Sequence, residues 1–166
     1  MIVIERPTTR PRVMDIVAQS GIDVSDWANA SGHPAKNPKY RSEWCFEKPG
    51  KLVLLSLWYE EMKEEKGQIF QLLNYKALAI TSEKNKRPIW VSRARRMDSL
   101  IYQAWRDSLT VRVMVCDGKR QEISKPGAKP SKVNLRYLDP ATWRIASYDQ
   151  STGACVVERN TPFQCH

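Results

Sequence analysis

Apolar side chains recur at steps of three and four residues between Pro88 and Ser108, which predicts the longest helix of the chain. Pro88 suits the first turn of such a helix. A shorter helix is predicted from Pro11 to a stop at Gly21, and a third over Gln68–Ile80. The stripe of the longest helix predicts a buried face, so we assign its two tryptophans to the core. It consists of Trp90, Ala94, Met97, Ile101, Ala104 and Trp105.

Strand-like segments occupy much of the remaining chain. Glu43–Phe46 and Lys51–Tyr59 flank a Lys48-Pro49-Gly50 turn and predict a hairpin. The apolar run Leu52–Leu55 is typical of a strand that is covered on both faces. The other predicted strands are Val111–Cys116 (ending at an Asp117-Gly118 turn) and Val133–Leu138. A second hairpin is predicted from the strands Trp143–Tyr148 and Ala154–Glu158.

These elements together predict an α+β fold, in which helices pack on a curved antiparallel sheet. A chain of 166 residues is long enough to bury a core, so we expect residues 1–166 to form a single domain. No apolar run approaches the roughly 20 residues that a membrane span needs. The start of the chain, Met1–Pro7, lacks the long apolar segment of a secretory signal, and we therefore expect a cytoplasmic protein.

Groups suited to catalysis or metal binding are few. The histidines are His33 and His166, and the four cysteines are far apart with no C-x-x-C pair. The sequence shows no phosphate-binding glycine loop, hydrolase elbow or zinc-protease motif. The acidic residues of Glu60–Lys66 fall in a run that is typical of a solvated surface. We therefore expect no enzymatic activity, metal or cofactor, and a nuclease with an unrecognised site is the enzymatic alternative.

Charge and aromatic content indicate a binding protein. The formal net charge is +9, the pI is about 9.5, and the chain has six tryptophans and six tyrosines. Lysine and arginine neutralise phosphates, and aromatic rings stack on unpaired or flipped bases at about 1–3 kcal/mol per base. Tryptophans more often belong to the core and basic runs more often form solvated surface, but the combination favours a nucleic-acid-binding domain.

Candidate contact residues fall into two groups. The polar loop Ser31–Arg41 is expected to be exposed, and within it Tyr40 is the favoured ring for contact with a base. The base-recognition candidates are His33, Asn37, Tyr40, Arg41, Trp27, Trp44 and Trp58. The phosphate-contact candidates are Arg93, Arg95, Arg96, Lys129, Lys132 and Arg136.

Several motifs add a resemblance to a known family. They are Asp23–Trp27, Asn37–Tyr40 with Trp44, Leu54–Trp58, Ser131–Pro140 with Trp143, and Tyr148–Gly153. Over residues 2 to 159 the chain resembles the N-terminal DNA-sensing region of McrA-like, modified-cytosine-dependent HNH restriction endonucleases. The resemblance implies recognition of methylated or hydroxymethylated cytosine, flipped into an aromatic pocket. The HNH nuclease has no counterpart here, so the resemblance implies either a sensor cut from a longer natural protein or a stand-alone relative.

We therefore expect a non-catalytic DNA-binding domain of a restriction or phage-defence system. Two alternatives stay open: an RNA-binding module, because stacking pockets also suit single-stranded RNA, and a protein–protein adaptor of a defence or toxin system. A homodimer is also open. Binding to nucleic acid should weaken steeply with salt, whereas an aromatic protein interface should respond less.

Overall fold

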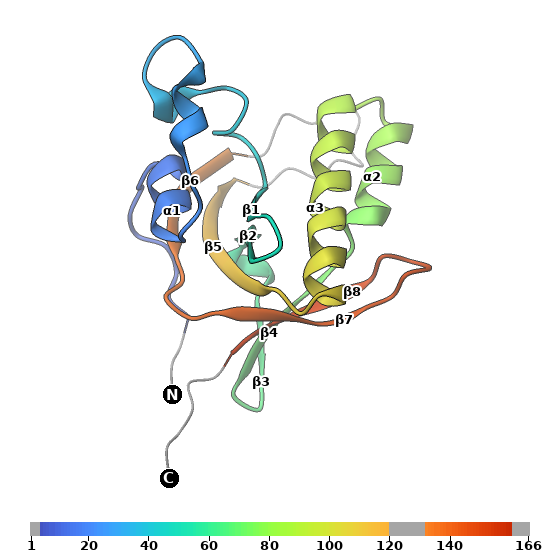
Figure 1. Ribbon diagram of the computed structural model, residues 1–166. Helices are drawn as coiled ribbons and strands as arrows, with labels where there is room; N and C mark the ends of the chain where they lie inside the picture. Colours follow the sequence, from blue (N-terminus) through green and yellow to red (C-terminus); the bar gives the residue numbers. More distant parts are fainter. Residues whose placement is uncertain (1–3, 120–131, 161–166) are drawn as a thin grey trace.

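The structure, a computed structural model, describes residues 4–119 and 132–160. Within these residues eight strands form one open sheet in the order β1-β2-β5-β7-β8-β4-β3, and β6 pairs with β5 beside this path (Figure 1). The helices are α1 (Val13–Gln19), α2 (Tyr75–Lys84) and α3 (Pro88–Arg106), with short 3-10 helices η1 (Ser25–Asn29), η2 (Pro34–Lys36) and η3 (Tyr59–Glu61). The strands are β1 (Cys45–Lys48), β2 (Leu52–Trp58), β3 (Lys63–Glu65), β4 (Gln68–Leu73), β5 (Thr110–Lys119), β6 (Lys132–Leu138), β7 (Trp143–Tyr148) and β8 (Cys155–Arg159).

The predicted α+β fold is confirmed, but the sheet is mixed and not antiparallel throughout as expected. Strand β2 runs parallel to β5 along its whole length, from Leu52 opposite Thr110 to Trp58 opposite Cys116. The other strand pairs within the described residues are antiparallel, including the two predicted hairpins β1–β2 and β7–β8. A parallel pair requires a long crossover connection, and residues 59–109 with both α2 and α3 supply it.

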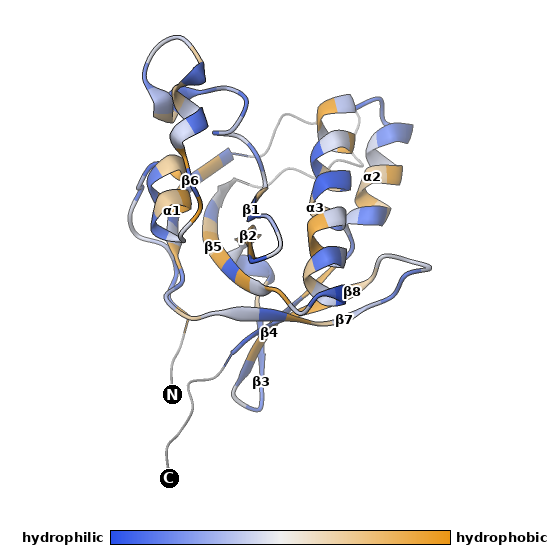
Figure 2. Cartoon of the chain, in the orientation of Figure 1, coloured by the Kyte–Doolittle hydropathy of each residue, from blue (hydrophilic) through white to orange (hydrophobic). Residues whose placement is uncertain are grey.

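Two layers of core lie on opposite faces of the central strands. Along β2, Val53, Leu55 and Leu57 pack in one buried cluster with residues of α3. The intervening Leu54 packs in a second cluster that includes Ile16 of α1. Because successive strand residues point to opposite faces, both faces of β2 need cover, as the apolar run predicted. Figure 1 shows α1 and α3 on opposite sides of β2 and β5, and Figure 2 shows hydrophobic and hydrophilic residues alternating along α3.

The predicted helix over Gln68–Ile80 is wrong at its start. Residues Gln68–Leu73 form β4, which pairs with β8, and α2 begins at Tyr75. Burial along β4 alternates, as in a strand that has one face in the core. Asn74 separates the two elements by capping α2, since its side chain accepts a hydrogen bond from the Ala77 N–H at 3.0 Å.

The predicted turn at Asp117-Gly118 is also wrong. Strand β5 continues to Lys119, and its register against β6 shifts between Asp117 and Gly118. Gly118 has φ 156°, and a Cβ at this position would collide with the backbone carbonyl of Lys132. The glycine therefore permits a bulge and a close approach of β6 where the sequence suggested a chain reversal.

The predicted helix Pro88–Ser108 is confirmed as α3. Its residues Ala94, Met97, Ile101 and Ala104 are buried. Trp105 is half-buried against the core. No helix of the described part of the chain has both the length and the apolar character needed to cross a bilayer.

Candidate functional site

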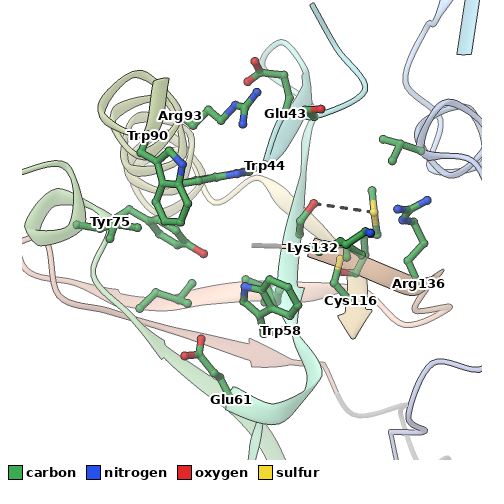
Figure 3. Close-up of a pocket in the computed structure, with 18 of the residues that line it drawn as sticks. Glu43, Trp44, Trp58, Glu61, Tyr75, Trp90, Arg93, Cys116, Lys132 and Arg136 are labelled. Carbon is green, nitrogen blue, oxygen red and sulfur yellow. Dashed lines mark hydrogen bonds between the residues drawn. The ribbon is translucent and has the colours of Figure 1, made fainter. Parts of the chain in front are cut away.

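A cavity of about 970 Å³ opens beside the last residues of β2 (Figure 3). The pairing of β1 with β2 begins at Cys45 opposite Leu55, and beyond it the Ser56 N–H bonds to the Trp44 carbonyl at 2.9 Å. Strands β2 and β4 are not neighbours in the sheet, yet residues of both line the cavity. Residues of α2, α3, β5 and β6 also line it. Segments far apart in sequence thus build one hollow.

Four aromatic side chains of the described residues line this cavity: Trp44, Trp58, Tyr75 and Trp90. The rings of Trp44 and Trp90 meet edge to face, with centroids 5.6 Å apart and planes at 87°. The Trp44 and Tyr75 centroids are 6.2 Å apart. Figure 3 shows these three rings together on one side, with Trp58 set apart from them across the opening. All four are half-buried, so each retains surface that a ligand can contact.

Regular secondary structure fixes the positions of these rings. On β2, Leu52 and Leu54 pack in the core beside α1, and Ser56 and Trp58 follow on the same strand face and line the cavity. Trp58 therefore continues a row that begins in the core. Tyr75 is the first residue of α2, and the other two tryptophans lie just before β1 and in the first turn of α3. Rings held this way need little reorganisation to bind a flat ligand.

Charged side chains surround the aromatic wall. Figure 3 shows Arg93 above the three clustered rings, and Lys132 and Arg136 on the opposite side of the opening. Arg136 is half-buried and donates a hydrogen bond to the Pro11 carbonyl at 2.9 Å. Burial lowers the pKa of Arg136, but a guanidinium remains charged at neutral pH. Cations therefore stand on both sides of the opening.

Acidic groups also reach the cavity. Glu43 forms an ion pair with Arg96 at 3.4 Å. Glu61 accepts a hydrogen bond from the Gln71 Nε2 atom at 3.2 Å. The site thus combines aromatic faces, cations and carboxylate acceptors.

The cavity also contains groups that burial keeps neutral. Burial raises the pKa of the Cys116 thiol to about 12 and raises the pKa of Tyr75 above its ordinary value. Both groups are therefore protonated at neutral pH, and Cys116 is a weak nucleophile. The Ser56 hydroxyl contacts the Met114 sulfur at 3.9 Å, drawn as the dashed line in Figure 3. Across residues 4–119 and 132–160, no three His, Cys, Asp or Glu side chains gather as a metal site would require.

The structure brings part of the predicted set together. The candidates that line the cavity are Arg41, Trp44, Trp58, Arg93, Lys132 and Arg136. Arg95 is exposed and pairs with Glu83 at 3.5 Å, away from the cavity lining. Lys129 lies outside the described residues. Contact of any of these side chains with phosphate stays a prediction.

Three further candidates, Trp27, Asn37 and Tyr40, lie in or against the core beside η1. Trp27 is 2% exposed and Asn37 is also buried, so neither ring nor amide is accessible to a base. The Asn37 amide donates to the Trp27 carbonyl at 2.9 Å and holds the loop closed. Tyr40 is half-buried, stacks on Trp27 with centroids 5.3 Å apart, and donates its hydroxyl to Asp26. The expectation that Trp27 and Asn37 contact a base is therefore wrong, because both are buried. Contact of the half-buried Tyr40 with a base stays a prediction, although its packing on Trp27 does not favour it. His33 is exposed, and its Nδ1 accepts the Ala35 N–H.

The sequence pattern missed several residues of the site. Trp90 follows the helical stripe, which predicts a core position, but it lies in the first turn of α3 and lines the cavity. Tyr75 falls inside the predicted helix Gln68–Ile80, so the pattern does not indicate that it begins α2. Glu61 falls in the acidic run Glu60–Lys66, which is typical of a solvated surface, but it lines the cavity. The Asn74 cap was a local signal that could have separated β4 from α2.

Replacement of Tyr40 by alanine is expected to lower the free energy of unfolding by about 2–4 kcal/mol, because it removes a ring packed on Trp27. The preference among bases should be that of the parent protein, since Tyr40 lies outside the cavity lining. Urea denaturation and an oligonucleotide titration measure the two quantities. A stable variant with altered base preference would return Tyr40 to the binding site.

Comparison of the chain with protein-family models, curated proteins and solved structures found no match.

Proposed function

We propose that this chain is a non-catalytic DNA-binding domain that recognises modified cytosine in a restriction or defence system. In this proposal the modified base leaves the duplex and enters the aromatic cavity, while the basic residues at the opening hold the adjacent phosphates. The observation that carries the proposal is the meeting of four aromatic side chains and flanking cations in one cavity of a strongly basic chain.

Size and shape support a nucleotide as the ligand. Small-molecule sites usually measure about 300–1,000 Å³, and the cavity lies at the upper end of that range. It has room for a base together with its sugar. Enzymes and sensors that inspect a base inside a duplex flip it out and hold it by stacking and by hydrogen bonds to its edge. Trp58 and the three rings opposite provide the stacking surfaces.

An apolar group in the cavity supports a substituted base. Leu72 of β4 is 56% exposed and lines the cavity. An exposed leucine in a concave site offers a surface for a small apolar substituent such as the 5-methyl group of a pyrimidine. The choice of cytosine follows from the resemblance of the sequence motifs to those of McrA-like sensors.

The test is a binding titration with matched duplexes that contain unmodified, 5-methylated or 5-hydroxymethylated cytosine. We expect tighter binding to a modified duplex and a steep loss of affinity with rising salt. Equal affinity for all three duplexes would contradict modified-base recognition. Tighter binding to single-stranded RNA of the same sequence would favour an RNA-binding module, and weak salt dependence would favour a protein partner.

Replacement of Arg93 or Lys132 by alanine is expected to weaken DNA binding by a similar factor on every sequence. Each lost phosphate contact should flatten the slope of log K against log salt by about one unit. Arg144→Ala is the matched control, because Arg144 is an exposed cation on β7 that pairs with Glu158 at 2.8 Å and lies outside the cavity lining. Unchanged salt slopes for both cavity variants would remove them from the interface.

A further inference from the structure

Gln71 is a polar residue at a buried position of β4, where neighbouring buried residues are apolar. It lies on β4 between the buried Ile69 and Leu73 and is itself 1% exposed. Its Nε2 donates to the Glu61 carboxylate, and within the described residues its Oε1 has no hydrogen-bond partner. A buried polar atom without a partner costs stability, so an apolar side chain here would stabilise the fold better. A role in orienting the Glu61 carboxylate would explain why a glutamine occupies this buried position.

Glu61 lies where a base edge would meet the cavity wall. It ends η3, three residues after Trp58, and lines the cavity. Figure 3 shows its carboxylate beside the Trp58 ring, at the lower end of the opening. An ionised carboxylate accepts hydrogen bonds through about four lone-pair positions and donates none. The bond from Gln71 therefore fixes its orientation while leaving it an acceptor.

We infer that Glu61, positioned by the buried Gln71, selects bases that carry an exocyclic amino group at the edge presented to it. The inference deepens the proposed function and rests on it. Carboxylates accept hydrogen bonds from the N4 amino group of cytosine. Thymine has the same 5-methyl group as 5-methylcytosine but a carbonyl oxygen at position 4, which would face the carboxylate without a proton between them. The cavity thus admits 5-methylcytosine and rejects thymine.

The experiment compares duplexes that carry 5-methylcytosine or thymine opposite the same abasic site, so that neither base is paired. We expect the wild-type protein to bind the 5-methylcytosine duplex at least about tenfold more tightly, as one base-edge contact provides. Glu61→Gln should bring the two affinities within about twofold, because an amide can turn its oxygen to an amino group or its nitrogen to a carbonyl. Glu65→Gln, an exposed residue of β3 with the same charge change, should keep the wild-type ratio.

A second variant tests the positioning role of Gln71. Gln71→Met keeps the size of the side chain and removes its hydrogen bond to Glu61. We expect the ratio between the two duplexes to fall toward that of Glu61→Gln while the melting temperature is no lower than in the wild type. A residue that only supports the fold would lower the melting temperature and leave the ratio unchanged, and that result would overturn the positioning role.

The outcomes separate the inference from the proposed function. If the wild-type protein prefers modified duplexes but binds 5-methylcytosine and thymine alike, the inference is wrong and the proposed function stands. The same holds if Glu61→Gln keeps the wild-type ratio. If the wild-type protein has no preference for modified over unmodified cytosine, the proposed function fails and the inference fails with it.

Discussion

Replacement of Asp139 by alanine is expected to lower the free energy of unfolding by about 3–5 kcal/mol. Asp139 is 1% exposed and accepts two hydrogen bonds from the buried Arg159, at 2.8 and 2.9 Å. It also accepts one from the indole of Trp143 at 2.7 Å. This hydrogen bonding raises the pKa of Arg159, which is therefore a buried cation. Removal of one partner from such a pair leaves the other charge uncompensated, which is strongly destabilising.

Urea denaturation measures this loss, and Glu158→Ala is the matched control. Glu158 pairs with the exposed Arg144, so its loss should cost less than about 1 kcal/mol. An equal effect of the two substitutions would show that the buried pair contributes little. Asp139, Trp143 and Arg159 form a buried network, so we expect them to stabilise the fold and not to contact DNA.

Replacement of Trp58 by alanine is expected to weaken binding to a duplex with a modified base by about 5- to 150-fold. A stacked ring contributes about 1–3 kcal/mol per base, and each 1.4 kcal/mol corresponds to a factor of ten. Trp58 lies at the end of β2 on the cavity wall, set apart from the other three rings. Trp58→Phe keeps a flat ring and should retain most of the affinity. A fluorescence titration measures both variants.

Trp105→Ala provides the control for loss of a large ring elsewhere. Trp105 packs against Tyr102 and Tyr148 and does not line the cavity. We expect it to lower stability while the folded protein keeps the affinity of the parent. Unchanged affinity in Trp58→Ala, with a normal melting curve, would exclude Trp58 from the contact with a base.

Local sequence patterns predicted the elements that are governed by short-range interactions. The stripe of α3 and the β1–β2 and β7–β8 hairpins depend on periodicity and turn residues, and all three are present. The identity of β4 depends instead on its pairing with β8, which follows it by more than eighty residues. A short run such as Gln68–Leu73 fits a helix or a strand until its partner is known. The parallel β2–β5 pair was not predicted for the same reason, because its two strands are distant in the sequence.

The candidate site was only partly predictable for the same reason. Trp44 and Trp58 stand next to polar residues in the sequence and are base-recognition candidates, and both line the cavity. Trp27 and Tyr40 had equally polar neighbours, but they pack on each other beside η1. Composition cannot separate these cases, because burial depends on which distant strand or helix covers a side chain. Gln71 gave no signal, since a lone glutamine in an apolar run is an ordinary surface residue.

The parallel pairing of β2 with β5 has a consequence for how the chain folds. The two central strands meet only after the whole intervening segment, residues 59–109, has been looped out and its ends brought together. Such non-local contacts slow folding relative to helical proteins of similar size. The cavity wall combines β2 with segments both inside and beyond that loop, so binding competence should appear late, together with closure of the central pair. Fragments that end before β5 should therefore lack both a complete sheet and a site.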